Sequence, residues 1–201
     1  MNGNIPIVKI SKEYYGLNQF IEDIEEIVRK YHKESDLLQH IRPLLYDLIN
    51  ISDSIPEEAF IPRNDRFADN LIYLSKDKRL SIIGSVWLPG QYTPIHDHLT
   101  WALVGMHEGE EIESIYKKIY DDSSNKIVLE QTSNKTNNKG HISVLGKDYM
   151  HRIENTSDKL SSSIHVYGID LGNVKRRSYD PTTGHTEPFA TGYDSILEFE
   201  K

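Results

Sequence analysis

The fold of this chain is decided by the stretch Leu88-Pro89-Gly90-Gln91-Tyr92-Thr93-Pro94-Ile95-His96-Asp97-His98, which places two histidines two residues apart after a Pro-Gly turn. Residues i and i+2 of an extended backbone project from the same face, so His96 and His98 point into one cavity while Asp97 points away. A third histidine, His151, arrives much later in the chain. Imidazole binds iron, nickel, copper and zinc alike, so the pattern predicts one divalent transition metal before it predicts which one.

The sequence around this stretch has a residue pattern typical of β-strands. Short runs rich in Ile, Leu, Val and Tyr are separated by polar turns, and this number of strands favours a sandwich or a barrel. The polar tract at residues 134–140 is interpreted as a surface turn. The expected strands span residues 71–74, 80–88, 101–106, 111–120, 126–131, 141–145 and 161–167.

Two amphipathic helices are expected ahead of the strands. Apolar residues recur at helical spacing over residues 17–33 and again over residues 35–49, where Pro43 is a candidate kink. We expect both helices to cover one side of the barrel. A chain of 201 residues favours a single domain. Within it we predict a helical segment over residues 1–66 and a barrel over residues 67–201.

Composition narrows the classes of function. The formal net charge of −8 is spread without a basic stripe, which argues against nucleic acid as a partner. The chain has no cysteine, so a metal must be held by imidazole or oxygen ligands. No stretch approaches the roughly 20 apolar residues of a membrane span, so we expect a soluble cytoplasmic protein. The oligomeric state stays open.

The spacing of glycines and histidines resembles the two motifs of the cupin superfamily. This resemblance implies a mainly β fold, a double-stranded β-helix or jelly-roll barrel, with the helices packed against it. The first motif usually contains a Glu ligand soon after the histidine pair, but residues 99–104 contain none. The implied site is therefore three neutral histidines. The matching positions are Gly90, His96, His98 and Gly109 in the first motif, and Gly146, His151 and Asn155 in the second.

A three-histidine site resembles the cysteine dioxygenase family of thiol dioxygenases, and bacterial cysteine or 3-mercaptopropionate dioxygenase-type members more than the animal enzyme. A second match is Ser163-Ile164-His165-Val166-Tyr167, which resembles the Ser, His, Tyr triad of that family. Alternation puts the three side chains on one strand face, where a hydrogen-bonded chain is natural. The resemblance implies Fe(2+), O2 and a small organic thiol that is oxidised to its sulfinate. It also implies that Tyr167 donates a hydrogen bond to the oxygen or the substrate while His165 and Ser163 hold its hydroxyl.

Two departures from the family bear on the site. The animal enzyme has a cysteine joined to its active-site tyrosine; this chain has none, with Ala102 near the equivalent place, so Tyr167 lacks that link. Cysteine-specific members carry an arginine ahead of the barrel that grips the substrate carboxylate. Asp69 stands at that position, and an aspartate repels a carboxylate and attracts a substrate ammonium group.

Another arginine is the candidate for carboxylate binding. Bacterial mercaptopropionate-type members carry one after the triad tyrosine, and the resemblance points to Arg176. Its neighbour Arg177 competes for the role, because adjacent residues of a strand cannot both face inward. Trp101 follows the histidine pair and is either barrel packing or a platform for the substrate.

Three functions follow from these features. The first is an oxidoreductase, a thiol dioxygenase that binds iron and acts on a small thiol with a short carboxylate or amine tail. The second is a three-histidine cupin oxygenase of a different specialised metabolite, to which Asp69 gives weight. The third is a non-catalytic cupin that binds a metal or a small molecule as a sensor or storage protein.

Overall fold

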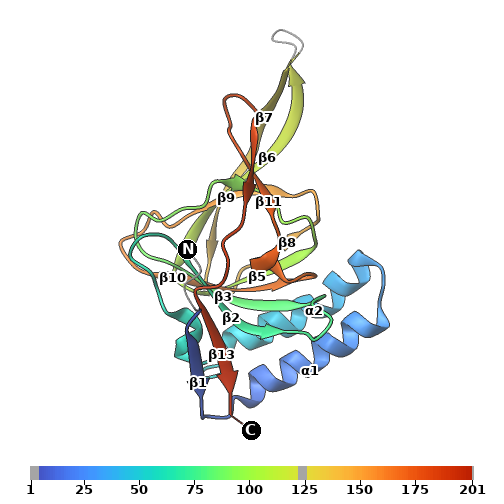
Figure 1. Ribbon diagram of the computed structural model, residues 1–201, viewed down its shortest axis with the longest axis vertical. Coiled ribbons are helices and arrows are strands. Elements are labelled where there is room, and N and C mark those ends of the chain that lie inside the picture. The colour runs from blue at the N-terminus through green and yellow to red at the C-terminus, as the bar shows by residue number, and fades with distance from the viewer. Residues whose placement is uncertain (1–4, 122–125, 201) are drawn as a thin grey trace.

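Strands dominate the chain from residue 68 onward in the computed structural model, which describes residues 5–121 and 126–200 (Figure 1). Two α-helices precede them. The elements are β1 (Ile7–Ile10), α1 (Tyr15–Lys30), α2 (Glu34–Asn50), η1 (Glu57–Phe60), β2 (Ala68–Leu74), β3 (Ser81–Trp87), β4 (Ile95–His96), β5 (Ala102–Glu108), β6 (Glu110–Asp121), β7 (Lys126–Asn138), β8 (Ile142–Leu145), β9 (Met150–Glu154), β10 (Ser161–Tyr167), η2 (Leu171–Asn173), β11 (Arg176–Tyr179), β12 (Thr186–Phe189) and β13 (Ser195–Phe199).

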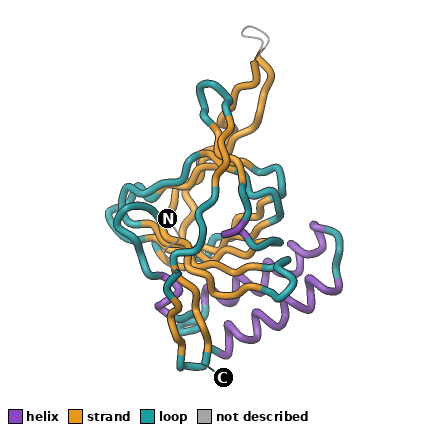
Figure 2. The backbone as a smooth tube through the Cα atoms, viewed as in Figure 1, coloured by secondary structure: helices purple, strands orange, loops and turns teal. Residues whose placement is uncertain are grey.

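The strands form two sheets that face each other as the walls of a double-stranded β-helix. One sheet has the order β1-β13-β2-β3-β10-β5-β8, and the other has the order β12-β11-β4-β9-β6-β7. Most neighbours are antiparallel, while β13 pairs in parallel with β1 and with β2. The tube in Figure 2 shows the strands grouped as a barrel with both helices outside it. The predicted jelly-roll fold is confirmed.

The helices cover the outer face of the seven-stranded sheet, as their apolar stripes predict. Buried Leu17 and Ile24 of α1 and Ile41 and Leu45 of α2 share one hydrophobic cluster with sheet residues such as Leu103. Pro43 lies inside α2 without ending it. Gly84 of the sheet is needed at this face, because a Cβ there would lie 2.1 Å from the Ala59 carbonyl oxygen.

Strand β10 is buried along its whole length because both of its faces are covered. Ile164 and Val166 belong to the cluster beneath the helices, whereas Tyr167 belongs to a second cluster inside the barrel. The two-residue period of a strand therefore sends Ser163, His165 and Tyr167 into the barrel interior. This alternation positions the part of the candidate site that β10 contributes.

The interpretation of residues 134–140 as a surface turn is wrong. Strand β7 runs through this tract to Asn138, and only the end of the tract turns. Asn137 is buried and donates hydrogen bonds from Nδ2 to Glu113 Oε2 at 2.9 Å and to Ser143 Oγ at 3.3 Å. An asparagine whose amide finds buried acceptors is stable in a strand despite its preference for turns.

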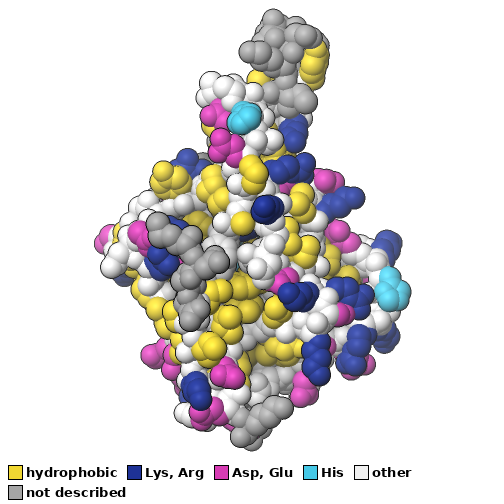
Figure 3. Space-filling view, in the orientation of Figure 1, with side chains coloured by type: hydrophobic (Ala, Val, Ile, Leu, Met, Phe, Trp, Pro, Cys, Tyr) yellow, Lys and Arg dark blue, Asp and Glu magenta, His cyan; other side chains and the backbone are white. Residues whose placement is uncertain are grey.

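The described surface is polar and mixed in charge. In the view of Figure 3, basic and acidic side chains surround a central group of hydrophobic ones, and no large region of this face carries one sign of charge. The β6–β7 hairpin projects from the barrel (Figure 1). Among the described residues, neither helix is both long enough and apolar enough to cross a membrane.

Candidate metal centre

Three histidines meet inside the barrel, as the spacing predicts. His96 of β4 pairs with His151 of β9 across the sheet, and His98 follows directly after β4. Their candidate ligand atoms all lie within 4.8 Å of one another, and all three side chains are buried. The chain leaves the site at Leu99, whose positive φ of 61° turns the backbone sharply after the second ligand.

The rings of these histidines are oriented for a shared cation. His96 Nδ1 lies 3.0 Å from the Pro94 carbonyl oxygen, which can only accept, so Nδ1 carries the proton and Nε2 keeps a lone pair. His151 Nδ1 likewise faces Glu113 Oε1 at 2.8 Å. The Nε2 atoms of His96 and His98 are 3.2 Å apart, and buried His98 Nδ1 has no hydrogen-bond partner among the described residues. These residues therefore fit a divalent transition metal.

Burial keeps the imidazoles of His96 and His98 neutral. Removal from water, followed by the charges of neighbouring histidines and Arg176, lowers the pKa of His96 and His98 well below 6.5. Neutral imidazole is the form that binds a metal, so these ligands need no deprotonation near neutral pH.

Glu113 supports His151 from behind. Its carboxylate is completely buried and also accepts hydrogen bonds from Ser143 Oγ at 3.0 Å and Tyr149 OH at 3.1 Å, while Lys135 Nζ lies 3.1 Å away. Burial alone raises the pKa of Glu113, but the hydrogen bond from His151 and the other partners hold it well below its usual range. An ionised carboxylate on the far nitrogen fixes the ring of a metal-binding histidine.

The Ser, His and Tyr side chains of β10 form the expected hydrogen-bonded chain. Ser163 Oγ lies 2.9 Å from His165 Nε2, and His165 Nδ1 lies 2.7 Å from Tyr167 OH. Burial, with the nearby charges of His151 and Arg176, lowers the pKa of His165 to about 3. Burial also raises the pKa of Tyr167 above its usual range. The Tyr167 and His98 ring centroids are 5.3 Å apart, so the chain ends beside the three histidines.

Glu111 extends this chain at its other end. Its carboxylate is buried, and Glu111 Oε1 lies 3.4 Å from Ser163 Oγ. Burial raises the pKa of Glu111 to about 8 against the opposing hydrogen bonds of Ser163 and Ser161. Neither Glu111 nor Glu113 is among the site residues predicted from the sequence. Their spacing of two on one strand, directly after the hairpin glycine, is the signal that could have found them.

A small cavity of about 20 Å³ connects these groups. Asp69 and Arg176 both line it, together with the three histidines. Arg176 is 3% exposed, whereas Arg177 faces away from the cavity and donates from Nε to Asp97 at 2.7 Å. The other lining residues are Phe67, Trp87, Thr93, Ile153, His165, Tyr167, Leu171 and Phe189.

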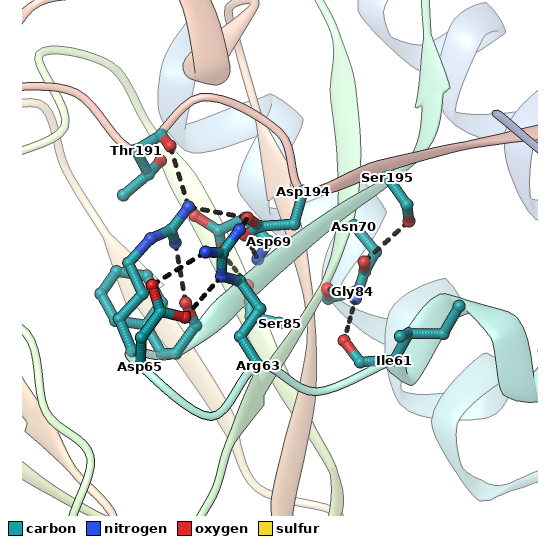
Figure 4. A network of polar contacts seen from close by, with 12 residues as sticks. Ile61, Arg63, Asp65, Asp69, Asn70, Gly84, Ser85, Thr191, Asp194 and Ser195 are labelled. Atoms are coloured by element: carbon teal, nitrogen blue, oxygen red, sulfur yellow. Dashed lines mark hydrogen bonds and ion pairs between the residues drawn. The ribbon is translucent and has the colours of Figure 1, made fainter. Parts of the chain in front are cut away.

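The two charged cavity residues are held by hydroxyls. Arg176 Nη2 donates to Thr191 Oγ1 at 3.1 Å, and its buried Nε has no hydrogen-bond partner among the described residues. Ser85 Oγ donates to Asp69 Oδ1 at 2.6 Å, and burial raises the pKa of Asp69. Figure 4 shows the backbone N–H of Asp69 bound to Asp194, which also accepts from Arg63.

Trp101 lies elsewhere. It packs in the hydrophobic cluster beneath the helices and is not among the described residues that line the cavity. Of the two interpretations made from the sequence, the structure places this side chain in barrel packing.

Comparisons with known proteins find one matching family and several similar solved structures. The family described as cysteine dioxygenase type I matches residues 61–180. The structure of TT1209 from Thermus thermophilus is similar, with 16% identity, a TM-score of 0.45, and coverage of 56% of this chain and 92% of that chain. A conserved protein with a double-stranded beta-helix domain from Klebsiella pneumoniae has 12% identity and a TM-score of 0.43, covering 67% and 94% of the two chains. A cupin superfamily protein from Desulfitobacterium hafniense has 13% identity and a TM-score of 0.40, covering 55% and 84%.

Proposed function

Because this chain belongs to the cysteine dioxygenase type I family, we propose that it is a non-haem iron(II) dioxygenase that uses O2 to oxidise a small organic thiol to its sulfinate. One observation carries the proposal. The three buried histidines and the phenol at the end of the Ser163–His165–Tyr167 chain face the same small cavity. A buried metal beside a buried hydrogen-bond donor suits a reaction that must exclude water.

The residues have separate tasks in this proposal. His96, His98 and His151 would hold iron(II) through Nε2. Bound iron would supply a Lewis acid for the thiol and the redox chemistry of O2, while three neutral ligands leave its double positive charge uncompensated. Tyr167 directs its hydroxyl at the reacting groups, and His165 and Ser163 orient that hydroxyl.

The charges of the cavity guide the choice of substrate. Among the described residues, Arg176 is a buried cation with an unused Nε–H and no ion-pair partner, and such a charge favours an anionic ligand. Asp69 is a buried acceptor in the same cavity and suits an ammonium group. We therefore propose a short thiol whose tail carries a carboxylate, an amine or both.

Oxygen uptake by the iron-loaded protein tests the function. Mercaptopropionate, cysteine and cysteamine separate the three kinds of tail, and the matching alcohols, hydroxypropionate, serine and ethanolamine, are controls that lack sulfur. We expect thiol-dependent uptake and a product heavier than the substrate by two oxygen atoms. If no thiol is consumed by protein that demonstrably holds iron, this reaction is wrong.

Asp69 also supports a second candidate, a three-histidine cupin oxygenase that acts on another metabolite. A buried carboxylate at this position disfavours the carboxylate end of cysteine itself. Product mass separates the two candidates, because oxidation at carbon leaves sulfur unoxidised or needs no thiol.

A further inference from the structure

The hydrogen-bonded chain of β10 does not end at Ser163. It continues across the barrel to Glu111 of β6, so three buried groups join the cavity to a carboxyl group in the opposite sheet. Glu111 is 1% exposed and lies away from the cavity lining. The mechanism proposed above assigns it no task.

The three groups between this carboxyl and the cavity each carry a single proton. His165 is neutral at neutral pH because burial lowers its pKa to about 3. Tyr167 keeps its phenolic proton because burial raises its pKa. Each of these groups donates one hydrogen bond along the chain and can accept another. All the bonds must therefore run in the same direction, and the end group selects that direction.

An ionised Glu111 can only accept. Ser163 then donates its proton to the carboxylate, which is the stronger, charge-assisted bond. The Ser163 oxygen accepts from His165 Nε2–H, which leaves a lone pair on Nδ1. That lone pair accepts the proton of Tyr167, so the phenol presents only its oxygen lone pairs to the cavity.

A Glu111 protonated on the oxygen that faces Ser163 reverses every bond. A carboxylic acid is a better donor than an alcohol, so Glu111 donates to Ser163 and Ser163 donates to His165 Nε2. The histidine proton now lies on Nδ1 and is donated to the Tyr167 oxygen. The phenolic proton is then free to point into the cavity.

We infer that Glu111 is a positioning residue whose protonation state decides whether Tyr167 donates or accepts a hydrogen bond in the cavity. The inference rests on the proposed function in one respect: that function gives the hydrogen bond from Tyr167 a task in the reaction. The polar groups around this carboxyl are Ser161 and Ser163 of β10 and the charged Glu113 on its own strand, while Asn137 of β7, opposite in register, bonds to Glu113 instead.

The surroundings of Glu111 bring its titration, and with it the reversal, into a pH range that can be measured. Burial and the negative charge of Glu113 favour the protonated form, and the pKa of Glu111 is about 8. No cation contacts its carboxylate among the described residues. We therefore expect Tyr167 to donate at neutral pH and to lose that role above about pH 8.

The tautomer of His165 reports the direction of the chain without metal or substrate. Nitrogen-15 NMR of histidine-labelled, metal-free protein distinguishes a proton on Nδ1 from one on Nε2, and His165→Gln assigns the signal. From about pH 6 to about pH 10 we expect the proton to move from Nδ1 to Nε2, with a midpoint near the pKa of Glu111. Glu111→Gln should abolish the midpoint, and exposed Glu110→Gln should keep it.

Two results would overturn the inference: a His165 tautomer that is constant over this range, or an unchanged midpoint in Glu111→Gln. If that variant does not fold, infrared spectroscopy of the wild type takes its place. We expect the carbonyl band of a protonated glutamic acid to disappear at the same midpoint, and its absence at neutral pH counts against the inference. Neither measurement uses iron-loaded protein or a thiol. A failure to oxidise thiols would therefore count against the proposed function alone, and a failure of these two measurements would count against the role of Glu111.

Discussion

Asp97 and Arg177 join two neighbouring segments of one sheet that both carry site residues: Arg177 Nε donates to Asp97 Oδ2 across 2.7 Å. Asp97 stands between two candidate ligands in the chain and points away from them, as alternation requires. It also accepts from the Arg177 backbone N–H at 3.1 Å and from Tyr179 OH at 2.7 Å. These bonds fasten the segment that carries His96 and His98 to strand β11, on which Arg176 faces the cavity.

Replacing Asp97 should loosen this junction. Asp97→Ala leaves buried Tyr179 OH and the Arg177 backbone N–H without their acceptor, so we expect a loss of about 3 kcal/mol in the free energy of unfolding. Urea unfolding of the metal-free protein measures it. Exposed Asp148→Ala is the control, and equal stabilities of the two variants would contradict the assigned role.

Removing any one of the three histidines should abolish stable binding of a divalent metal. His96→Ala, His98→Ala and His151→Ala each leave two ligands where a closed imidazole site needs three. Anaerobic calorimetric titration with iron(II) should give one ion per chain for the wild type and for exposed His141→Ala. Retention of full affinity by any of the three alanine variants would show that the ion sits elsewhere.

The carboxylate of Glu113 should strengthen metal binding without touching the metal. Glu113→Gln keeps the shape of the side chain but removes the charge behind His151, so we expect affinity to fall about 10- to 100-fold. The same titration measures this change. The exposed residue Glu110 offers a matched Glu110→Gln control on the same strand, whose affinity should equal that of the wild type.

Arg176 and Asp69 should select substrates by the charge of the tail. Arg176→Gln should raise KM for mercaptopropionate by about 30-fold or more, because it removes a buried, charge-assisted partner of the carboxylate. Asp69→Asn should raise KM for cysteamine and leave that for mercaptopropionate unchanged or lower. Steady-state oxygen uptake measures both, and exposed Arg79→Gln is the control. Identical effects on the two thiols would refute a charge-based choice.

Acid should destabilise the metal-free protein steeply. The pKa values of His96, His98 and His165 are lowered in the folded state, so below about pH 6.5 the unfolded chain binds more protons than the folded one. The contribution of these histidines is therefore full above this pH and falls by about 1.4 kcal/mol per pH unit for each of them, while the raised pKa of Glu111 opposes one such contribution above about pH 4.5. His165→Gln should reduce the slope by one such contribution in urea unfolding at several pH values. An unchanged slope would mean that His165 is protonated when folded.

The sequence predicted the parts of the fold whose pattern is strong. Both helices, the barrel and the inward histidines follow from the spacing of apolar residues and from two short motifs. Short strands such as β4 and β12 carry too few residues to show alternation, and they form because a neighbouring strand pairs with them. Sheet pairing between segments distant in the sequence is invisible to a local pattern.

The buried carboxylates escaped prediction for a physical reason. In the strand that carries Glu111 and Glu113, the isoleucines look like the inward face and the acids like the solvent face. The structure reverses this, because Ser163, His151 and Asn137 arrive from other strands to satisfy the acids. Arg176 was correctly preferred over Arg177 as the inward residue, since only one of two adjacent strand residues can face a cavity.

The small cavity also has a consequence for competition among thiols. Its free volume of about 20 Å³ holds about one water molecule, so even a short thiol enters only when lining side chains move, and a bulkier tail requires larger movements. Its walls include Phe67, Trp87 and Phe189, whose rigid rings offer no room for a branched or peptide-linked tail. A short thiol can therefore be selected by its small size over a tripeptide thiol such as glutathione. Discrimination of this kind operates by steric exclusion and needs no recognition of the larger competitor.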